Sequence, residues 1–376
     1  MSQSTSHLFS PLKLRSLVLP HRIAVSPTCE YSSNDGFAND WHFVHLGSRA
    51  IGGAALVLTE ASAVSPEGRI TPHDLGIYKD EHVSELRRVT TFLHAHGAYA
   101  GTQLAHAGRK ASMAVPWEKV RLIPVEEGGW EPVAPSAIRF DEPYGLPKVL
   151  DRAGMDKVIA DFTTAARRAI RAGFDLVEVH AAHGYLLHEF LSPLSNRRDD
   201  EYGGSFENRV RFPLEVIRAV RDAWPQQLPV FVRISATDWA PESLGPAWDL
   251  PQSVEFARLL KKEGVDLVDV STGGNHPGQQ IPAGSGHQVH HSSVIRSEAG
   301  VLTAAVGMIT SPSQADQIVR SGQGDLVFLA RELLRNPYWP LHAADALHQQ
   351  ISWPVQYARA ANSSVVPRRA ISTATD

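Results

Sequence analysis

Cysteine is nearly absent from this chain. Cys29 is the single cysteine among 376 residues. One thiol cannot form an intrachain disulfide, and it cannot supply the several ligands of a cysteine-based zinc site or an iron–sulfur cluster. The sequence therefore favours a protein of a reducing compartment, which we take to be the cytoplasm.

The chain also lacks an excess of charge and a long apolar run. Its 36 basic and 40 acidic residues leave a formal net charge of −4, which gives no electrostatic reason to expect nucleic acid or an anionic membrane as partner. The longest run of apolar and glycine residues, Ala50 to Leu58, is far shorter than the roughly 18 residues that a transmembrane helix needs. Residues 1–11 contain no apolar stretch of the kind found in a secretory signal. We expect neither nucleic acid nor membrane as a partner.

Short β-branched runs alternate with longer amphipathic stretches along most of the chain. Such alternation is typical of parallel strands joined by helices, and eight such units predict an α/β protein of the (β/α)8 barrel type. The predicted strands are Arg22–Ser26, Ala54–Thr59, Tyr99–Gln103, Phe174–His180, Pro229–Ser235, Val265–Ser271, Gly300–Val306 and Asp325–Ala330. The clearest helical stretches are Asp80–His96, Asp156–Ala172, Ser205–Trp224, Gln252–Glu263 and Pro312–Ser321.

Three segments do not fit the strand–helix repeat. The segment Phe9–His21 has alternating leucines, which predict an N-terminal hairpin that plugs the end of the barrel where the strands begin. The connection after the third strand is too long for one helix, and its many prolines and glycines predict an irregular loop that caps the opposite end. We treat residues 1–361 as a single barrel and the polar residues 362–376 as a flexible C-terminal tail.

The functional groups of a parallel barrel gather where its strands end. The loops after the seventh and eighth strands of such barrels commonly bind a phosphate. Here they contain Gly307, which allows a ligand to approach the backbone closely, and Arg331, whose guanidinium can form bidentate hydrogen bonds to a phosphate. The short run Arg331–Arg335 is stopped by Pro337. The sequence favours a phosphate-bearing cofactor at this position over a plain turn with a surface arginine.

His180 and His183 follow the fourth strand and allow three interpretations. They could bind a metal, donate hydrogen bonds to a substrate oxygen, or be buried histidines satisfied by the backbone. A catalytic zinc needs three protein ligands, and neither a cysteine nor a well-placed carboxylate stands out nearby, so we favour oxygen donors over a metal site. Tyr185 comes next in the chain and is a candidate proton donor, or else an aromatic residue that packs in the barrel rim.

Two further strand-end residues have an alternative structural explanation. Arg233 is predicted to point toward the barrel mouth, where an unpaired cation would be costly, so it indicates either an anionic ligand or a structural ion pair. Cys29 lies at the end of the first strand but, as a lone cysteine, could equally be an inert buried thiol.

Several long motifs resemble the old yellow enzyme family of FMN-dependent ene-reductases. The matching runs are Pro20–Tyr31, Gln103–Ala111, His180–Arg209, Val306–Thr310 and Arg331–Arg335, and the resemblance extends from about His7 to Arg359. Cys29 and the ending Gln356–Arg359 are similar to the thermophilic-like branch of that family. Ala330 stands where the family usually has glycine, and Thr28 where it often has methionine, but neither change removes a functional side chain.

The resemblance implies a role for each matching residue. Ser26, Pro27, Thr28, Cys29 and Ala61 would line the flavin ring, Gln103 and Arg233 would face its pyrimidine edge, and Gly307, Ala330 and Arg331 would hold the FMN phosphate. His180 and His183 would bind the substrate carbonyl, Tyr185 would donate the proton, Tyr31 would border the substrate, and Cys29 would tune the flavin. Arg359 would reach the active site of a neighbouring subunit in a homodimer or homotetramer.

The activity implied by the resemblance is the reduction of the C=C bond of α,β-unsaturated carbonyl compounds. NADPH or NADH would supply a hydride to FMN, and the flavin would pass it to an enone-type small molecule in a ping-pong reaction. Two other functions stay open at this point: a metal-dependent barrel lyase or aldolase that uses His180 and His183, and a flavin-binding protein without catalysis.

Overall fold

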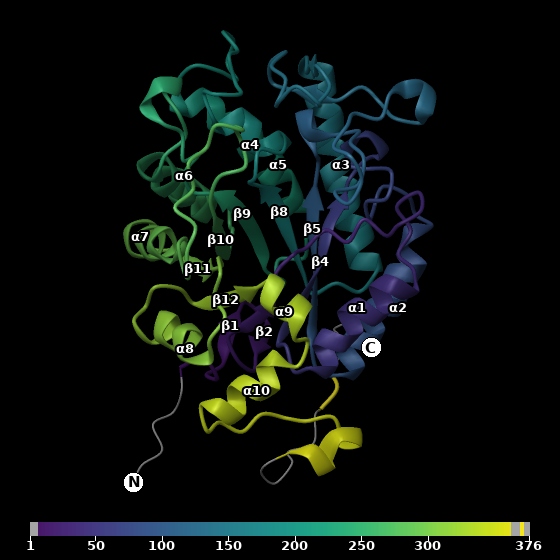
Figure 1. Cartoon of the computed structure of the whole chain (residues 1–376), viewed down its shortest axis with the longest axis vertical. Helices are drawn as coiled ribbons and strands as arrows, with labels where there is room; N and C mark the ends of the chain where they lie inside the picture. Colours follow the sequence, from purple (N-terminus) through teal and green to yellow (C-terminus); the bar gives the residue numbers. More distant parts are fainter. Residues whose placement is uncertain (1–6, 362–368, 372–376) are drawn as a thin grey trace.

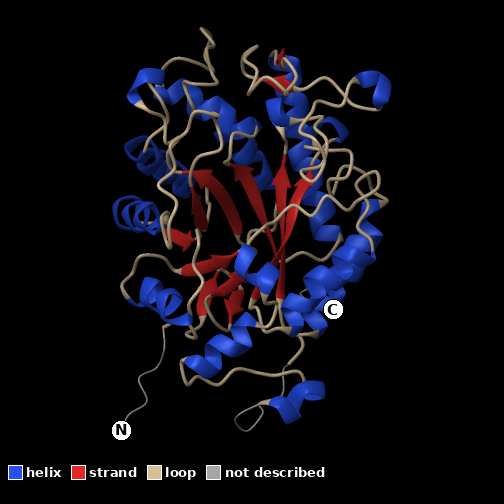
Figure 2. Ribbon diagram, in the orientation of Figure 1, coloured by secondary structure: helices blue, strands red, loops and turns tan. Residues whose placement is uncertain are grey.

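Eight parallel strands form a closed barrel, which confirms the predicted fold class (Figures 1 and 2). The computed structural model describes residues 7–361 and 369–371. The strands pair in the order β3-β4-β5-β8-β9-β10-β11-β12, and β12 pairs with β3 to close the barrel. Their bounds are β3 (Ile23–Val25), β4 (Leu56–Ala63), β5 (Tyr99–Ala105), β8 (Leu176–Ala181), β9 (Val230–Ser235), β10 (Leu267–Ser271), β11 (Leu302–Ala305) and β12 (Leu326–Leu329).

Helices connect the strands on the outside of the barrel (Figure 1). They are α1 (Asp40–Ile51), α2 (His82–Ala95), α3 (Arg152–Arg171), α5 (Phe206–Ala223), α6 (Leu250–Lys262), α7 (Val289–Ala299) and α8 (Pro312–Arg320), with the shorter α4 (Leu186–Leu191), α9 (Arg331–Arg335) and α10 (Trp339–Ala346). Local sequence fixes several ends: the Ser311 side chain accepts a hydrogen bond from the Gln314 N–H to start α8, and Gly264 follows α6 with a φ of +82°. Within the described ranges no helix is long and apolar enough to cross a membrane.

The N-terminal hairpin closes the end of the barrel where the strands begin, as predicted. Strands β1 (Leu12–Leu14) and β2 (Leu17–Leu19) pair antiparallel. Their four leucines are buried against the first inward-facing side chains of the barrel strands. Those side chains include Leu56, Leu176, Phe231 and Leu267. The interior of the barrel at this end is therefore a packed apolar core.

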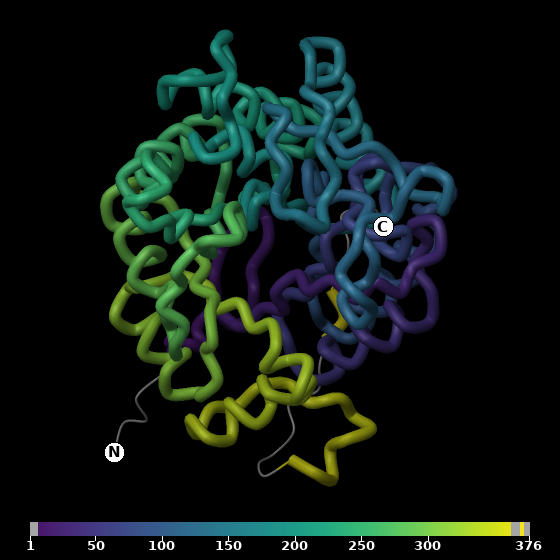
Figure 3. The backbone as a smooth tube through the Cα atoms, turned by 45° about the horizontal axis from the view of Figure 1, so that its top comes forward, coloured from purple at the N-terminus to yellow at the C-terminus, as the bar shows by residue number. Residues whose placement is uncertain are grey.

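The long connection between β5 and α3 lies along the opposite rim, where the strands end (Figure 3, blue). It contains a short parallel pair, β6 (Val133–Ala134) with β7 (Lys148–Val149). The indole ring of Trp117 on this connection lies edge-on to the ring of Tyr31, with 5.9 Å between their centroids. The connection thus reaches the residues that follow β3.

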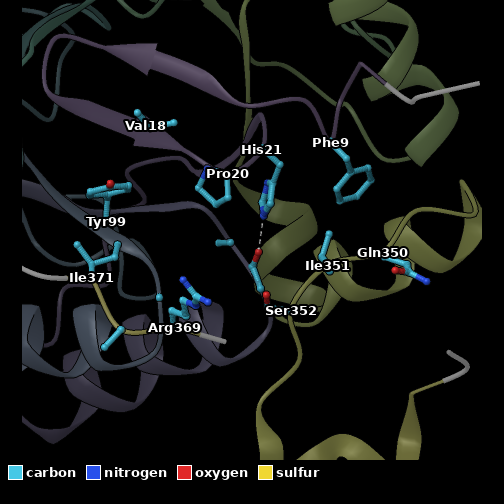
Figure 4. A pocket seen from close by; sticks show the side chains of 14 residues that line it. Phe9, Val18, Pro20, His21, Tyr99, Gln350, Ile351, Ser352, Arg369 and Ile371 are labelled. Atoms are coloured by element: carbon cyan, nitrogen blue, oxygen red, sulfur yellow. Dashed lines mark hydrogen bonds between the residues drawn. The ribbon is translucent and has the colours of Figure 1, made fainter. Parts of the chain in front are cut away.

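A cavity of about 670 Å³ lies outside the hairpin, far from the strand ends (Figure 4). Its wall includes Phe9, Val18, Pro20, Tyr99 and the short C-terminal stretch Arg369–Ile371. The Ile371 N–H donates a hydrogen bond to the His94 carbonyl oxygen at 3.0 Å. The other residues of the predicted tail, 362–368 and 372–376, lie outside the described residues.

Candidate functional site

The inward-facing side chains change from apolar to polar along three neighbouring strands. Successive residues of a strand point to opposite faces, so every second residue faces the barrel interior. Above the leucine layer, β8 presents Glu178 and His180, β9 presents Arg233, and β10 presents Asp269 and Ser271. All five are buried. A cluster of buried polar groups at the strand ends is the position of the active site in barrel enzymes.

Arg233 is paired inside the barrel. Its Nε lies 3.2 Å from Oδ2 of Asp269, and its Nη1 donates a hydrogen bond to Oγ of Ser26 at 3.1 Å. Burial raises the pKa of Asp269, and the charge of Arg233 opposes that rise. Of the two readings left open by the sequence, the structural ion pair is present, and Arg233 still lines the neighbouring cavity.

Gln103 on β5 is held by Glu178 on β8. The two residues are register partners, and Nε2 of Gln103 donates a hydrogen bond to Oε1 of Glu178 at 2.8 Å. Burial raises the pKa of Glu178, the charge of Asp269 raises it further, and Arg233 opposes both. Neither Glu178 nor Asp269 was among the residues predicted for the site. Their positions in the sequence could have indicated that they face the barrel interior. Each lies two residues before a polar residue at a strand end and so points to the same side of its strand.

The segment after β3 is fixed by backbone hydrogen bonds on both sides. The Ser26 N–H donates to the Leu329 carbonyl oxygen at 3.0 Å, and the Glu30 N–H donates to Oε2 of Glu60 at 2.9 Å. The Oγ1 of Thr28 donates to the Ser26 carbonyl oxygen at 3.2 Å. Pro27 lies between these contacts, so residues 26–30 form a rigid edge along the ends of β3 and β4.

A bulge in β4 places Ala61 beside Gln103. The pairing register between β4 and β5 shifts between Leu58 and Ala61, and Ala61 then pairs with Gln103. A bulge re-aims the side chains that follow it, so a small residue faces the interior next to the buried amide. The structure thus brings Ala61, Gln103 and Ser26 to one side of the strand ends.

Cys29 is a protonated thiol in this environment. Burial raises its pKa well above the ordinary value, and the nearby carboxylates of Glu60 and Asp74 raise it further. Tyr31, two residues on, has a φ of +47°. A thiol with a raised pKa is a poor nucleophile, so the site does not favour covalent chemistry at Cys29.

His180, His183 and Tyr185 form one aromatic cluster at the end of β8. The ring centroid of His180 lies 5.2 Å from that of His183 and 5.2 Å from that of Tyr185. Burial, reinforced by the charge of Arg233, lowers the pKa of both histidines well below the usual value. Both imidazoles are therefore neutral, and each carries one N–H donor.

The two histidines differ in their present partners. Nε2 of His183 lies 2.6 Å from Oγ of Ser271, whereas Nδ1 of His180 is buried without a hydrogen-bond partner among the described residues. His183 has a φ of +60°, and its N–H donates to Oγ of Ser235 at 2.9 Å. Among the described residues, no group of three or more His, Cys, Asp or Glu side chains is placed to hold a metal ion.

Lys110, which follows β5, lies close to the end of β8. Its Nζ donates to the carbonyl oxygens of His183, at 2.8 Å, and of Gly274. It also lies 5.4 Å from the centroid of the Tyr185 ring. Burial lowers the pKa of Lys110 to about 7. Burial also raises the pKa of Tyr185 well above its usual value, so its hydroxyl keeps its proton.

A cavity of about 300 Å³ runs from these polar residues to the ends of β11 and β12. Arg233 and Ser271 line one part of it, and Gly307, Ala330 and Arg331 line another. Gly307 has a φ of +121°, and a Cβ there would lie only 2.8 Å from Nε2 of Gln288. The Arg331 side chain is exposed and has no hydrogen bond or ion pair with another described residue.

This cavity fits the requirements of FMN. A glycine cradle and a free guanidinium suit a phosphate, and the buried amide of Gln103 and the Arg233 cation suit the polar edge of the flavin ring. Of the residues that the sequence assigned to the cofactor, Arg233, Gly307, Ala330 and Arg331 line this cavity.

Arg359 is not brought to this site within the chain. It lies in a 3-10 helix, η5 (Val355–Ala360), and is exposed. Figures 1 and 3 show this last part of the chain, in yellow, beyond α10 and away from the ends of β8 and β9.

Comparisons with known proteins agree with this geometry. The sequence pattern of the NADH:flavin oxidoreductase / NADH oxidase family matches residues 7–350. The chain is 49% identical over 354 residues to an NADPH dehydrogenase of Geobacillus sp. strain WCH70, covering 94% of this chain and 98% of that protein. It is 47% identical over 357 residues to an NADPH dehydrogenase of Listeria innocua serovar 6a, covering 94% and 99% of the two chains.

Solved structures share the whole fold. A structure of morphinone reductase superposes with a TM-score of 0.76 at 28% identity, over 98% of this chain and 96% of that one. Morphinone reductase in complex with tetrahydroNAD superposes with a TM-score of 0.75 at 27% identity, over 93% of each chain. The likeness therefore covers the barrel, its hairpin and the site together.

Proposed function

We propose that this chain, which belongs to the NADH:flavin oxidoreductase / NADH oxidase family and is an FMN-dependent oxidoreductase, reduces the C=C bond of enone-type small molecules. The resemblance to the old yellow enzyme family is confirmed by the same comparisons. The observation that carries the finer proposal is the pair of neutral, buried histidines beside a protonated tyrosine, next to the cavity that suits a flavin.

Residues on both sides of the cavity would hold FMN. Gly307, Ala330 and Arg331, which line the cavity, would bind the phosphate. Arg233, which also lines it, and Gln103, which is held by Glu178, would bind the polar edge of the ring. The backbone of residues 26–29 and Ala61 would line the ring, with Cys29 near its reactive part. When bound, FMN supplies the hydride chemistry, accepting a hydride from NAD(P)H and delivering it to the substrate in a ping-pong cycle.

The histidines would then polarise the substrate. An N–H from each of His180 and His183 would bind the carbonyl oxygen, on which negative charge develops as a hydride arrives at the β-carbon. His183 would exchange its contact with Ser271 for this one. Tyr185 would donate its hydroxyl proton to the α-carbon, which is consistent with its raised pKa, and Tyr31 would border the substrate.

Single-turnover kinetics test this proposal. The anaerobic protein is first reduced with NADPH or NADH and then mixed with 2-cyclohexenone, and flavin absorbance is followed in both steps. NADPH and NADH are each tested as the hydride donor. We expect the enone to reoxidise the reduced flavin far faster than buffer alone does. Reduction by NAD(P)H without any enone-dependent reoxidation would contradict ene-reduction and favour a flavin-binding protein of another role.

Arg359 would complete the active site of a neighbouring subunit. Its exposure and its distance from its own strand ends support a role in a homodimer or homotetramer rather than within one chain. The lone thiol supports a cytoplasmic location. Light scattering gives the oligomeric state of the active enzyme. An enzyme that is a monomer while it reduces enones would contradict the role of Arg359.

A further inference from the structure

The buried carboxyl group of Glu178 lies beside Gln103 and has no role in the proposed reaction. Glu178 is fully buried, and its Oε1 accepts a hydrogen bond from Gln103 at 2.8 Å. Its Oε2 is also buried but has no hydrogen-bond partner among the described residues. A buried carboxylate oxygen without a donor is costly when charged, so this position calls for an explanation.

We propose that Glu178 is a positioning residue whose carboxyl group takes up a proton from solvent when the flavin next to Gln103 is reduced. This inference rests on the proposed function, because it requires FMN in the cavity with its polar edge against Gln103 and Arg233. It adds a group that couples proton uptake to the flavin without touching the substrate.

The hydrogen bond from Gln103 places Glu178 one side chain away from the cofactor. Because Nε2 of Gln103 is directed to Glu178, the amide oxygen of Gln103 is left to accept a hydrogen bond on its other side. The flavin ring offers an N–H donor at its pyrimidine edge. The carboxylate form of Glu178 therefore fixes which end of the Gln103 amide faces the flavin, because a carboxylate can only accept a hydrogen bond.

The pKa of Glu178 responds to nearby charges, because Asp269 raises it and Arg233 lowers it. Arg233 on the neighbouring strand β9 and Asp269 on β10 also point into the barrel interior, and His180 follows on the same strand as Glu178. Within the described residues β5 contributes the neutral amide of Gln103. Asp269 is the ion-pair partner of Arg233, at 3.2 Å, and the charge of Arg233 also acts on Glu178.

Flavin reduction adds that one charge. A hydride brings two electrons and one proton to the ring, so one negative charge remains near Gln103 and Arg233. In a buried site this charge strengthens proton binding at a neighbouring carboxylate. The second proton comes from solvent and forms an O–H bond on Glu178, and no other oxidant or reductant is needed. The raised pKa of Glu178 places its titration within reach of neutral to mildly alkaline solution.

The midpoint potential of the bound FMN measures this coupling. Potentials of the holoenzyme are recorded anaerobically from about pH 6 to about pH 9, in wild type and in Glu178→Gln. Glutamine has the shape of the protonated acid and still accepts from Gln103, but it cannot gain a proton. We expect the pH slope of the wild type to rise toward twice that of the variant over part of this range, because two protons rather than one accompany two electrons.

Two further variants make the result specific. Glu189 on α4 is another fully buried glutamate with a raised pKa, and it accepts a hydrogen bond from the Arg109 N–H at 2.8 Å. We expect the Glu189→Gln variant to keep the wild-type pH slope. Asp269→Asn removes the charge that raises the pKa of Glu178, and we expect the steep part of the curve to move to lower pH. Reduction-induced infrared difference spectra of the wild type should show a new protonated carboxyl band, which gives a second readout if Glu178→Gln loads FMN poorly.

The outcomes separate this inference from the proposed function. Identical pH slopes in wild type and Glu178→Gln, or no new carboxyl band in the wild type on reduction, would overturn the inference while leaving FMN chemistry intact. A folded protein that does not take up FMN would overturn both. An unchanged slope in Glu189→Gln together with a halved slope in Glu178→Gln would support the inference.

Discussion

At the scale of single residues, burial decides which groups around the strand ends carry a charge. It keeps His180 and His183 neutral, Tyr185 protonated and Cys29 a thiol. A neutral imidazole keeps one N–H to donate and does not attract an anion by charge. The set is therefore suited to stabilising charge that develops during a reaction, rather than charge already present on a ligand.

Cys29 should react slowly with alkylating reagents. Because only the thiolate reacts, a raised pKa lowers the reactive fraction at a given pH, and the rate should keep rising with pH beyond the range of an ordinary thiol. At about pH 8 we expect alkylation by iodoacetamide to be at least about tenfold slower than for the same protein unfolded in urea. A rate that levels off below neutral pH would show a low-pKa thiolate and reopen covalent catalysis.

Arg331 should be needed to retain FMN. Replacement by alanine removes a charged hydrogen-bond donor to the phosphate, which is worth about 1.5–3 kcal/mol or roughly 10- to 100-fold in the dissociation constant. Arg320→Ala is the matched control, because Arg320 pairs with Asp316 on α8 outside the cavity. Fluorescence titration of the flavin-free proteins with FMN measures both variants, and equal affinities would contradict the phosphate role.

At the scale of elements, the apolar side chains that stabilise the barrel lie at one end of its axis and the polar side chains lie at the other. The strand beginnings pack on the leucines of the hairpin, and the strand ends present the polar groups. The alternation of inward side chains lets one strand serve both purposes, as Leu176, Glu178 and His180 do on β8.

The hairpin should contribute to stability through its buried face. Leu19→Ala removes a fully buried side chain from the apolar cluster and should lower the free energy of unfolding by about 2–5 kcal/mol. Val18→Ala, at the next position, changes a half-exposed side chain and should cost about 0.5 kcal/mol or less. Urea unfolding at saturating FMN gives both values, and equal effects would mean that the hairpin does not plug the barrel.

The loop after β11 should depend on glycine at position 307. An alanine there would be strained at a φ of +121° and would meet the Gln288 amide, so Gly307→Ala should weaken FMN binding and lower the melting temperature. Gly284→Ala is the control, because no atom lies within 4 Å of its Cβ position. Matching FMN affinities in the two variants would argue against a close backbone approach at Gly307.

Sequence patterns predicted the strands better than the helices. All eight barrel strands lie where β-branched runs stand, but the assignment named no helix at Asp40–Ile51 or Val289–Ala299. In α7 the buried positions include the polar residues His291 and Ser292, so the sequence lacks the continuous apolar face that predicts a helix. In α1 the capping box uses His42 where Glu or Gln is usual.

The site was predictable where a strand ends and hidden where it depends on pairing across the barrel. Strand-end position singled out Arg331 and the two histidines from the sequence alone. The ion pair between Arg233 and Asp269 and the contact between Gln103 and Glu178 join different strands. Such contacts depend on the register between strands, which no local pattern specifies.

At the scale of the whole molecule, the barrel has one end with buried polar groups and one packed apolar end. The family match over residues 7–350 and the superposition with morphinone reductase both include the two ends. The larger cavity, about 670 Å³, lies at the packed end, whereas the cavity of about 300 Å³ lies among the polar strand ends. Cavity size alone would therefore point to the packed end of the barrel, whereas side-chain chemistry points to the strand ends.

The central claim is that His180 and His183 donate hydrogen bonds to the oxygen of an enone. Stopped-flow absorbance of the flavin, in wild type and in His180→Ala and His183→Ala, follows reduction by NAD(P)H and reoxidation by 2-cyclohexenone separately, with and without EDTA. We expect each alanine variant to slow reoxidation by about 10²–10³, to affect reduction less, and to be partly rescued by asparagine, with no effect of EDTA on the wild type. Normal reoxidation in the alanine variants, or inactivation by EDTA that zinc reverses, would contradict the claim and favour a metal-dependent lyase or aldolase.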